Sequence, residues 1–233
     1  MNDFNKKTLI FIPARMGVRP QERVNLNKIN GRTLLQQTLK FAENFSDLGK
    51  IFISSNDLRI VKKFKNYSHN YLRPKKLSSS GSNIVESILD GLNFLKNLGY
   101  MFKNVILLPP TSPLRKKTDL KKALKKFKKQ NIDALVSVVA MRENPYLCIK
   151  KSNGKWNFLQ NKRNKSTLSH KKFFFIDRNF CIAKTRFLKK YRNFLVENKT
   201  KFYNQKRYIT VDLNEFRNED YKIAQDFLRK KNI

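Results

Sequence analysis

Short apolar runs alternate with longer amphipathic segments, and this alternation limits the possible folds more than any other feature of the chain. Runs of strand length lie at Leu9–Ile12, Ile51–Ser54, Val105–Leu108 and Ala134–Val139. Segments with helical spacing of apolar residues lie at Thr33–Phe45, Asp57–Phe64, Ile84–Leu98 and Lys116–Lys129. Strands alternating with helices predict an α/β fold, with a mostly parallel, Rossmann-like sheet and helices on both faces.

The second half of the chain departs from this alternation. Two further strands are predicted at Phe173–Ile176 and Tyr208–Leu213, and a helix at Asn218–Lys230. We expect this helix to lie over the sheet, with its inward face formed by Tyr221, Ile223, Ala224, Phe227 and Leu228. The polar segment from Arg142 to Lys172 has no clear place in the sheet.

The length of 233 residues predicts one domain, residues 1–233, with a small extension at about 142–175. The extension contains the only tryptophan, Trp156, together with Tyr146, Leu147 and Phe158. Apolar side chains without a place in the core often mark an interface, so we expect a homodimer.

The charge of the chain is strongly positive, with 51 Lys and Arg against 17 Asp and Glu and a net charge of +34. A basic chain can bind nucleic acid. Here the lysines are scattered through nearly every segment and accompany abundant Asn, Ile and Phe, all encoded by A/T-rich codons. We therefore attribute the excess to composition and expect no nucleic-acid partner, although the positive field would attract anionic substrates.

Three further features indicate the compartment. The sequence contains no run of 18 apolar residues, so we expect no membrane span. The first apolar run is too short for the core of a signal peptide. Cys148 and Cys181 stand in apolar surroundings and are interpreted as free, buried thiols. These features predict a cytoplasmic protein.

The end of the first strand has the properties of a phosphate-binding loop. The sequence I-P-A-R-M-G-V-R occupies residues 12–19, so two arginines, Arg15 and Arg19, flank Gly17 directly after a buried strand. Ligands of open α/β sheets bind where strands end. Guanidinium groups bind phosphates bidentately, and a glycine lets the backbone approach them. The alternative is a buried strand followed by a turn with two surface arginines.

Four sequence blocks together resemble the acylneuraminate cytidylyltransferase (CMP-sialic acid synthetase) family. Residues 12–19 are similar to its I-P-A-R-x-G-S-K, and residues 107–115, L-L-P-P-T-S-P-L-R, to its L-L-Q-P-T-S-P-L-R. Residues 73–78, R-P-K-K-L-S, match R-P-x-x-L-S, and V-D-L-N at 211–214 resembles I-D-I-D. The blocks occur in the family's order along nearly the whole chain.

The resemblance implies a fold of the nucleotide-diphospho-sugar transferase type and a reaction. A hydroxyl of a sialic-acid-like, nine-carbon acidic sugar would attack the α-phosphorus of CTP, and pyrophosphate would leave. Mg²⁺ would be the cofactor. The octulosonate cytidylyltransferases are a less favoured relative, because their first loop carries an L-P-G-K-P run that is absent here.

The resemblance also implies site residues. Catalytic roles fall to Arg15, Arg19 and Asp212, and metal binding to Asp212 and Asn214. Substrate-binding roles fall to Gly17, Arg23, Asn25, Arg73, Ser80, Thr111, Ser112 and Asn179. Asn25 has a loop-capping alternative, Asp212 a turn-capping one, and the serines around Ser80 an ordinary helix N-cap. Arg115 is expected to brace its loop rather than to contact substrate.

The chain departs from the family at polar positions, namely Val18, Val24, Ser80, Pro109 and Asn214. Asn214 stands where the family has a second Asp, and an amide oxygen brings no negative charge to a metal. The departures keep an alternative open: a non-catalytic or weakly active nucleotide-binding homologue.

Overall fold

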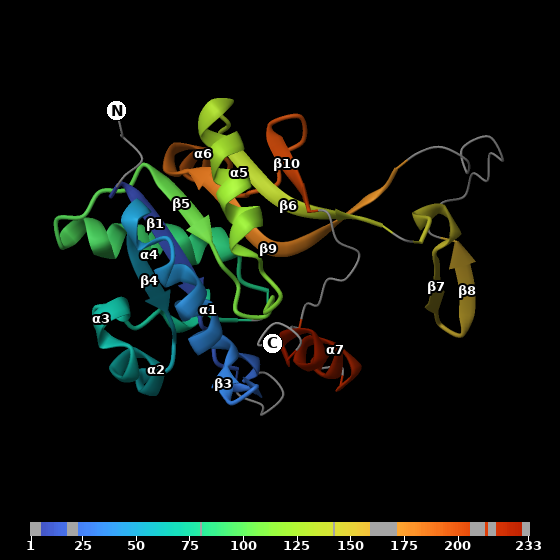
Figure 1. Cartoon of the computed structure of the whole chain (residues 1–233), viewed down its shortest axis with the longest axis horizontal. Helices are drawn as coiled ribbons and strands as arrows, with labels where there is room; N and C mark the ends of the chain where they lie inside the picture. Colours follow the sequence, from blue (N-terminus) through green and yellow to red (C-terminus); the bar gives the residue numbers. More distant parts are fainter. Residues whose placement is uncertain are drawn as a thin grey trace.

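A six-stranded sheet forms the centre of the protein, in the order β10-β6-β9-β5-β1-β4 (Figure 1). The structure is a computed structural model that describes residues 6–17, 23–79, 81–141, 143–158, 172–205, 213 and 218–229. The strands are β1 (Thr8–Pro13), β4 (Gly49–Ser54), β5 (Asn104–Leu107), β6 (Ala134–Ala140), β9 (Phe174–Lys184) and β10 (Thr200–Gln205). Only β9 runs antiparallel to its neighbours in this sheet.

The parallel strands place their carboxyl ends at one edge of the sheet. Strand β1 pairs with β4 on one side and with β5 on the other, and it is almost completely buried. A strand buried on both faces is an unbroken apolar run, which is the pattern of Leu9–Ile12. The loops that follow β1, β4 and β5 therefore leave the sheet side by side.

Helices cover both faces of the sheet, as the sequence predicts. On one face, α1 (Leu34–Glu43) and α5 (Lys117–Lys129) pack on Ile10, Ile12 and Ile106. On the other face, α4 (Ile84–Asn97) and α6 (Thr185–Tyr191) pack on Phe11, Val105 and Val136. Figure 1 shows these two layers on either side of the sheet.

The starts of the helices follow from side chains in the preceding loops. Thr33 and Gln36 form a reciprocal capping box at the start of α1. The side chain of Asn83 accepts a hydrogen bond from Val85 N at the start of α4. Asp57 caps α2 (Leu58–Lys63), which precedes the short α3 (Lys65–Ser68). Each cap satisfies a donor that the helix itself leaves open.

The last helix does not lie over the central sheet. Helix α7 (Asn218–Arg229) packs beside the small hairpin of β2 (Lys28–Ile29) and β3 (Arg32–Thr33), where Ala224 joins a cluster with Val24 and Leu34. The prediction that Ile223 faces inward is wrong, because 44% of its surface is exposed. The helix packs on a small cluster beside the β2–β3 hairpin and not on the broad face of a sheet, so fewer of its apolar side chains are buried than predicted.

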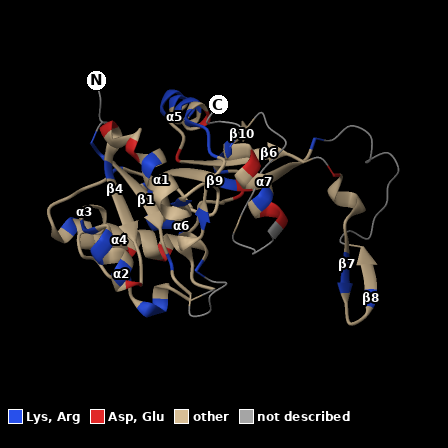
Figure 2. Ribbon diagram, turned by 60° about the horizontal axis from the view of Figure 1, so that its bottom comes forward, with Lys and Arg blue, Asp and Glu red and all other residues tan. Residues whose placement is uncertain are grey.

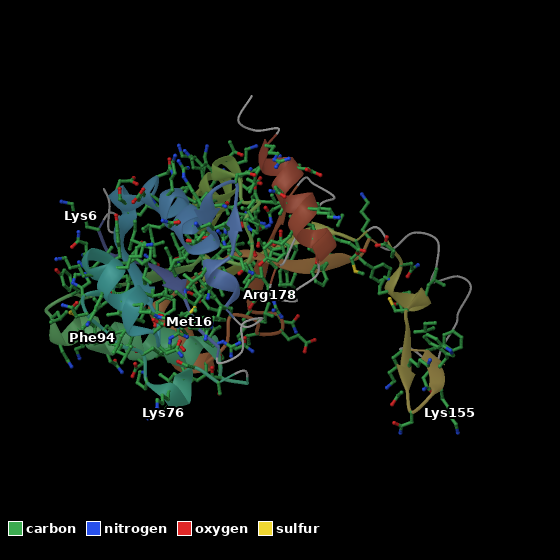
Figure 3. The ribbon with its side chains drawn as sticks, turned by 90° about the horizontal axis from the view of Figure 1, so that it is seen from below. Lys6, Met16, Lys76, Phe94, Lys155 and Arg178 are labelled. Carbon is green, nitrogen blue, oxygen red and sulfur yellow. The ribbon has the colours of Figure 1, made fainter. Side chains whose placement is uncertain are left out.

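The segment after β6 forms an arm that projects from the body (Figure 1). It carries a hairpin of β7 (Ile149–Ser152) and β8 (Lys155–Phe158), which the sequence does not predict. Figure 3 shows Lys155 at the far end of this arm. The two strands of the hairpin pair with each other, and neither belongs to the central sheet.

Several predicted elements differ from the structure for identifiable reasons. Strand β9 continues well beyond the predicted Phe173–Ile176, because the polar residues Asp177–Asn179 interrupt its apolar pattern before the second half, which pairs with β5 at Cys181–Lys184. The sequence also does not predict β10, an edge strand whose exposed side chains break up its apolar pattern. The strand predicted at Tyr208–Leu213 lies outside the described residues except for Leu213.

The cysteines and the basic residues are placed largely as predicted. Cys148 and Cys181 are both free; Cys181 is buried, whereas Cys148 is only partly buried. Figure 2 shows Lys and Arg on nearly every element rather than on one face. No helix in the described parts of the chain has the length and apolar character needed to cross a membrane.

Candidate active site

Hydrogen bonds from the β4 side fix the loop that follows β1. Ala14 N donates to Ser54 O at 2.8 Å, and Ser55 Oγ donates to Ala14 O at 2.7 Å. The side chain of Asn56 then bonds both main-chain groups of Met16, at 2.8 and 3.0 Å. The loop continues the β1–β4 pairing beyond the sheet, so the backbone on either side of Arg15 is held.

Asn25 holds the same loop from the opposite side. It lies in a short 3-10 helix, Val24–Leu26, and is buried. Its side-chain amide donates to Arg15 O at 2.6 Å. Asn25 therefore positions Arg15, and it also lines the cavity described below. Both its loop-bracing and its substrate-binding interpretations are compatible with this position.

Arg73 is a buried cation beside this loop. Its main-chain N–H donates to Ser55 O at 2.8 Å, and its guanidinium donates to Ser54 Oγ at 3.0 Å and to Ser54 O. Burial lowers the pKa of Arg73 to about 10, and the positive charge of Arg15 acts in the same direction. The group stays charged at neutral pH although its surroundings disfavour the charge.

Neither guanidinium group is paired with a carboxylate in the described part of the chain; the acid that acts on Arg73, Asp90, is hydrogen-bonded to Tyr71. Arg15 Nη1 lies 3.4 Å from Ser78 O, a weak contact with the loop that follows Arg73. Neither Arg15 nor Arg73 forms an ion pair with a carboxylate among the described residues. Two neighbouring guanidinium groups, neither of them paired with a carboxylate in the described part of the chain, favour an anionic ligand.

A cavity of about 640 Å³ opens where these residues meet, at the carboxyl ends of the parallel strands. Its wall on the β1 and β4 side includes Pro13, Arg15, Val24, Asn25, Arg73, Ser79, Ser82, Ile84 and Ser87. Its wall on the β5, β9 and β6 side includes Leu107, Pro109, Pro110, Thr111, Val136, Ile176, Arg178, Cys181, Asn193, Phe194 and Leu195. This volume is in the range of nucleotide and drug-sized ligand sites.

The loop after β5 contains two predicted substrate-binding residues, of which one lines the cavity and the other is buried below its surface. Thr111 lines the cavity, whereas Ser112 is fully buried and donates from Oγ to Arg178 O at 3.2 Å. Arg115 is also buried, and it donates to Asn179 O at 2.6 Å and to Thr38 Oγ1 at 3.2 Å. Arg115 braces the loop, as the sequence predicts.

Asn179 belongs to a buried polar cluster rather than to the cavity wall. Its side-chain amide donates to the Asp177 carboxylate, which also accepts hydrogen bonds from Ser137 Oγ at 2.5 Å and from the amide of Gln205. Asp177 and Asn179 are both buried. The cluster fixes the bulge of β9, and a direct contact between Asn179 and substrate stays a prediction.

Arg178 is a site residue that the sequence reasoning missed. It lies between Asp177 and Asn179 on β9 and lines the cavity on the side away from β1, which carries Arg15. Its φ of 52° is in the left-handed region, so the backbone turns there and the cluster stabilises that turn. Figure 3 shows Arg178 on the body of the protein rather than on the arm. The sequence signal that could have identified Arg178 is its position next to Asn179, a predicted substrate-binding residue.

The remaining predicted residues divide into two groups. Gly17 and Arg23 are described, but neither lines the cavity, and Arg23 is exposed. Arg19, Ser80, Asp212 and Asn214 lie outside the described residues. In the described part of the chain, no group of three or more His, Cys, Asp or Glu side chains is placed to hold a metal.

Leu213, the residue between the two predicted metal ligands, is described. It is fully buried, and its N–H donates to Thr111 O at 2.9 Å. Thr111 itself lines the cavity. Leu213 is therefore joined to the loop after β5 beside the cavity.

A second cavity, of about 760 Å³, lies at the opposite edge of the sheet. The start of β5, the end of α5 and the start of α6 line it, and it contains none of the predicted site residues. Ligands of open α/β sheets bind at the carboxyl ends of the strands, so the first cavity is the candidate site.

A sequence model of the family described as cytidylyltransferase matches residues 9–232. The chain belongs to the cytidylyltransferase family. The match includes the V-D-L-N block and also the loop after β1, the R-P block and the loop after β5, each of which contributes residues to the cavity wall. The family and the fold confirm the resemblance that these motifs predict.

Three relatives indicate where in the family the chain lies. A "CMP-N,N'-diacetyllegionaminic acid synthase" of Legionella pneumophila is 27% identical over 144 residues, which are 61% of this chain and 62% of that protein. A "Pseudaminic acid cytidylyltransferase" of Campylobacter jejuni is 28% identical over 123 residues, 52% and 53% of the two chains. A "Post-translational flagellin modification protein B" of Campylobacter coli is 26% identical and covers 97% of this chain and 96% of its own.

The chain thus spans 62% and 53% of the length of the first two relatives that it matches. Solved structures support the fold. A CMP:2-keto-3-deoxy-manno-octonic acid synthetase, in complex with CTP, superposes with a TM-score of 0.67 at 11% identity, over 97% of this chain and 100% of that one. A 4-diphosphocytidyl-2C-methyl-D-erythritol synthase superposes with a TM-score of 0.63 at 12% identity, over 96% and 98%. At these identities the likeness concerns the fold.

Proposed function

We propose that the protein is a CTP-dependent cytidylyltransferase that activates an acidic, nine-carbon sugar of the nonulosonic acid class. The observation that carries this proposal is the meeting of Arg15 and Arg73 in the cavity, with no carboxylate paired to either among the described residues. A triphosphate supplies the negative charge that this arrangement lacks. The relatives named for legionaminic and pseudaminic acid support the class of sugar.

In the proposed reaction, an oxygen of a sugar hydroxyl attacks the α-phosphorus of CTP. A new phosphorus–oxygen bond forms, the bond to the β-phosphate oxygen breaks, and pyrophosphate leaves while the hydroxyl proton passes to solvent. The protein mainly positions the groups and neutralises charge. Arg15 holds the phosphates, Asn25 and Asn56 hold the backbone of the Arg15 loop, and Arg73 supplies a fixed positive charge beneath it.

Asp212 and Asn214 are proposed to hold Mg²⁺, which when bound neutralises charge on the phosphates. The hydrogen bond from Leu213 to Thr111 supports this assignment, because it joins the V-D-L-N block to the cavity wall. A carboxylate and an amide oxygen are ligands that suit Mg²⁺. With one carboxylate instead of two, the metal depends more on the phosphates.

A homodimer in the cytoplasm is the proposed form of the enzyme. The hairpin of β7 and β8 carries three large apolar residues and one lysine on one face, because Ile149 pairs with Phe158, and Lys151, whose ammonium lies over the Trp156 ring, pairs with Trp156. Trp156 is 65% exposed. An isolated two-stranded hairpin is at best marginally stable in water, so an apolar face of this kind favours a covering partner.

A second candidate is a nucleotide-binding homologue without turnover. It is favoured by Val24 and Pro109, which line the cavity where the resembled family has a lysine and a glutamine. Pyrophosphate release separates the two candidates. The purified protein is incubated with CTP, Mg²⁺ and a panel of nonulosonic acids. An enzyme releases pyrophosphate only with CTP and an acceptor sugar together, whereas the homologue binds CTP and releases none.

A further inference from the structure

Arg178 is the exposed member of an otherwise buried segment of β9. Asp177, Asn179, Phe180 and Cys181 are buried, whereas Arg178 is exposed and lines the cavity. Its φ of 52° lies in the left-handed region, which a residue with a long side chain rarely adopts. The backbone is therefore turned at the one charged residue of this segment that reaches the cavity.

The turn is a bulge in the pairing of β9 with β6. The register of the two strands shifts at Ser137 of β6, which alone lies opposite residues 177–180 of β9. Bulges re-aim side chains, and they are frequent next to active sites. This bulge removes Arg178 from the regular alternation of the strand and brings it to the cavity wall.

A buried carboxylate holds the bulge together. Asp177 accepts hydrogen bonds from Ser137 Oγ at 2.5 Å and from Asn179 N at 3.2 Å. The side-chain amides of Asn179 and Gln205 donate to the same carboxylate. Ser137 Oγ in turn accepts a hydrogen bond from Phe180 N at 3.2 Å. The two main-chain N–H groups that follow the turn are therefore both bound to this buried polar cluster.

The loop after β5 holds the carbonyl groups of the same turn. Ser112 Oγ donates to Arg178 O at 3.2 Å, and Arg115 Nε donates to Asn179 O at 2.6 Å. Burial raises the pKa of the Cys181 thiol to about 12, and the nearby charge of Arg178 acts in the opposite direction. Cys181 also lines the cavity, so the guanidinium lies close to the cavity floor while buried groups fix the backbone behind it.

Arg178 lies apart from the two guanidinium groups of the phosphate side. Arg15 follows β1 and Arg73 bonds the end of β4, whereas β9 is separated from β1 by β5. On its own side the wall also includes the polar residues Thr111 and Asn193, but in the described part of the chain Arg178 is the charged one. A ligand that spans the cavity therefore meets positive charge at both ends.

We propose that Arg178 binds the carboxylate of the acceptor sugar, and that Asp177 is a positioning residue that holds Arg178 in the turned conformation for this contact. The inference rests on the proposed function, which puts the triphosphate at Arg15 and an acidic sugar at the other end of the cavity. Arginine binds a carboxylate through two parallel, charge-assisted hydrogen bonds, so the direction of its side chain matters. Asp177 does not line the cavity and acts through Arg178.

The first test is Arg178→Asn, because asparagine tolerates the left-handed conformation and carries no charge. Kinetics are measured with CTP and the nonulosonic acid that the wild type turns over fastest. The KM for the sugar should rise by about 10- to 100-fold, as expected for lost hydrogen bonds to a charged group, while the KM for CTP stays within about twofold. Arg192→Asn is the matched control, since Arg192 has a φ of 50° and does not line the cavity.

The second test separates positioning from packing. Asp177→Asn puts a donor among the donors of the cluster, and it should raise the KM for the sugar by about 10-fold without changing the KM for CTP. In the double variant with Arg178→Asn the KM for the sugar should rise no further than in Arg178→Asn alone. Gln205→Leu removes one donor and keeps the carboxylate, so it tests the same point in a milder way, with an expected rise of about 3- to 10-fold.

The outcomes for the inference and for the proposed function are distinct. An unchanged KM for the sugar in Arg178→Asn, or an equal rise for the sugar and CTP, would overturn the inference and leave the proposed function intact. Additive effects in the double variant, or an unchanged KM for the sugar in Gln205→Leu, would overturn the positioning role of Asp177. No turnover of any acid by the wild type would overturn the proposed function and the inference together.

Discussion

The side-chain amide of Asn25 donates a hydrogen bond to the main-chain oxygen of Arg15, 2.6 Å away. The bond joins the loop after β1 to the 3-10 helix at Val24–Leu26. Arg15 is thus positioned by a residue ten places further along the chain, through its backbone rather than its guanidinium. The backbone is fixed in this way, and the side chain is left to meet a ligand.

Removal of this bond is expected to weaken catalysis without unfolding the protein. An ordinary hydrogen bond contributes about 0.5–1.5 kcal/mol, so Asn25→Ala should lower kcat/KM by up to about 10-fold. Asn27→Ala is the control, because Asn27 bonds Tyr221 of α7 at 2.7 Å and does not line the cavity. Steady-state kinetics on both variants, with circular dichroism for folding, check the prediction. An equal loss in Asn27→Ala would mean that the effect is structural.

CTP is expected to stabilise the protein through Arg73. Burial disfavours the charge of this guanidinium, and a bound phosphate compensates for it. At 100 times its Kd a ligand adds about 2.7 kcal/mol, which corresponds to a rise in Tm of about 5–10 °C for a chain of this size. Arg73→Ala should lose most of this rise.

The control for that measurement is Arg186→Ala, since Arg186 is an exposed arginine outside the candidate site. It should keep the full CTP-dependent rise in Tm. Comparing the shift with and without CTP in each variant separates the effect on binding from any change in intrinsic stability. A full shift in Arg73→Ala would exclude Arg73 from nucleotide binding.

The parts of the fold that the sequence predicts are those with strong local patterns. The β1 strand is a continuous apolar run, and α1 and α4 have wide apolar faces and side-chain caps, so each is found close to its predicted bounds. The antiparallel direction of β9 has no local signal. It results from pairing with β5 and β6, which are distant in sequence.

The same distinction applies to the site. Motifs place Arg15, Asn25, Arg73 and Thr111 correctly on one cavity. Ser112 lies on the same loop as Thr111 and Asn179 lies on β9, but their side chains point to Arg178 O and to Asp177. A motif identifies a loop, whereas the direction of each side chain depends on the buried groups beneath it. Arg178 adjoins the predicted Asn179, but its place on the cavity wall depends on a left-handed turn that the sequence does not indicate.

The metal site is expected to be depleted, because Asn214 replaces a carboxylate of the resembled family. Asp212→Ala should remove activity at any practical Mg²⁺ concentration. Asn214→Asp should lower the Mg²⁺ concentration needed for the half-maximal rate, since it adds a negative charge to the site. A Mg²⁺ titration of pyrophosphate release measures both effects.

The control for the metal prediction is Asp226→Asn, on the exposed surface of α7, which should behave as wild type. An unchanged or higher Mg²⁺ requirement in Asn214→Asp would show that this block does not hold the metal.

The arm is expected to hold two copies of the chain together. Trp156→Lys removes the largest apolar side chain from the exposed face shared with Ile149 and Phe158 and places a second charge there beside Lys151, whose ammonium lies 5.2 Å from the Trp156 ring. Light scattering at micromolar concentration should give the mass of a dimer for the wild type and that of a monomer for Trp156→Lys. Asn157→Lys, on the opposite face of the hairpin, should remain a dimer. A monomeric wild type would contradict the assignment of the arm.

The most direct test of the account is the turnover of CTP by the wild type and by Arg15→Ala under identical conditions. Both proteins are incubated with CTP, Mg²⁺ and a nonulosonic acid, while pyrophosphate release is followed and the CMP-sugar is identified by mass spectrometry. Arg15→Ala loses a charge-assisted contact worth about 2–4 kcal/mol in the transition state, or about 30- to 1000-fold in rate. Arg59→Ala, an exposed arginine paired with Asp57, should be unaffected. The account predicts equal amounts of pyrophosphate and CMP-sugar from the wild type and a loss of at least 30-fold in Arg15→Ala. Wild-type protein without turnover, or an Arg15→Ala variant that retains about the wild-type rate, would contradict it.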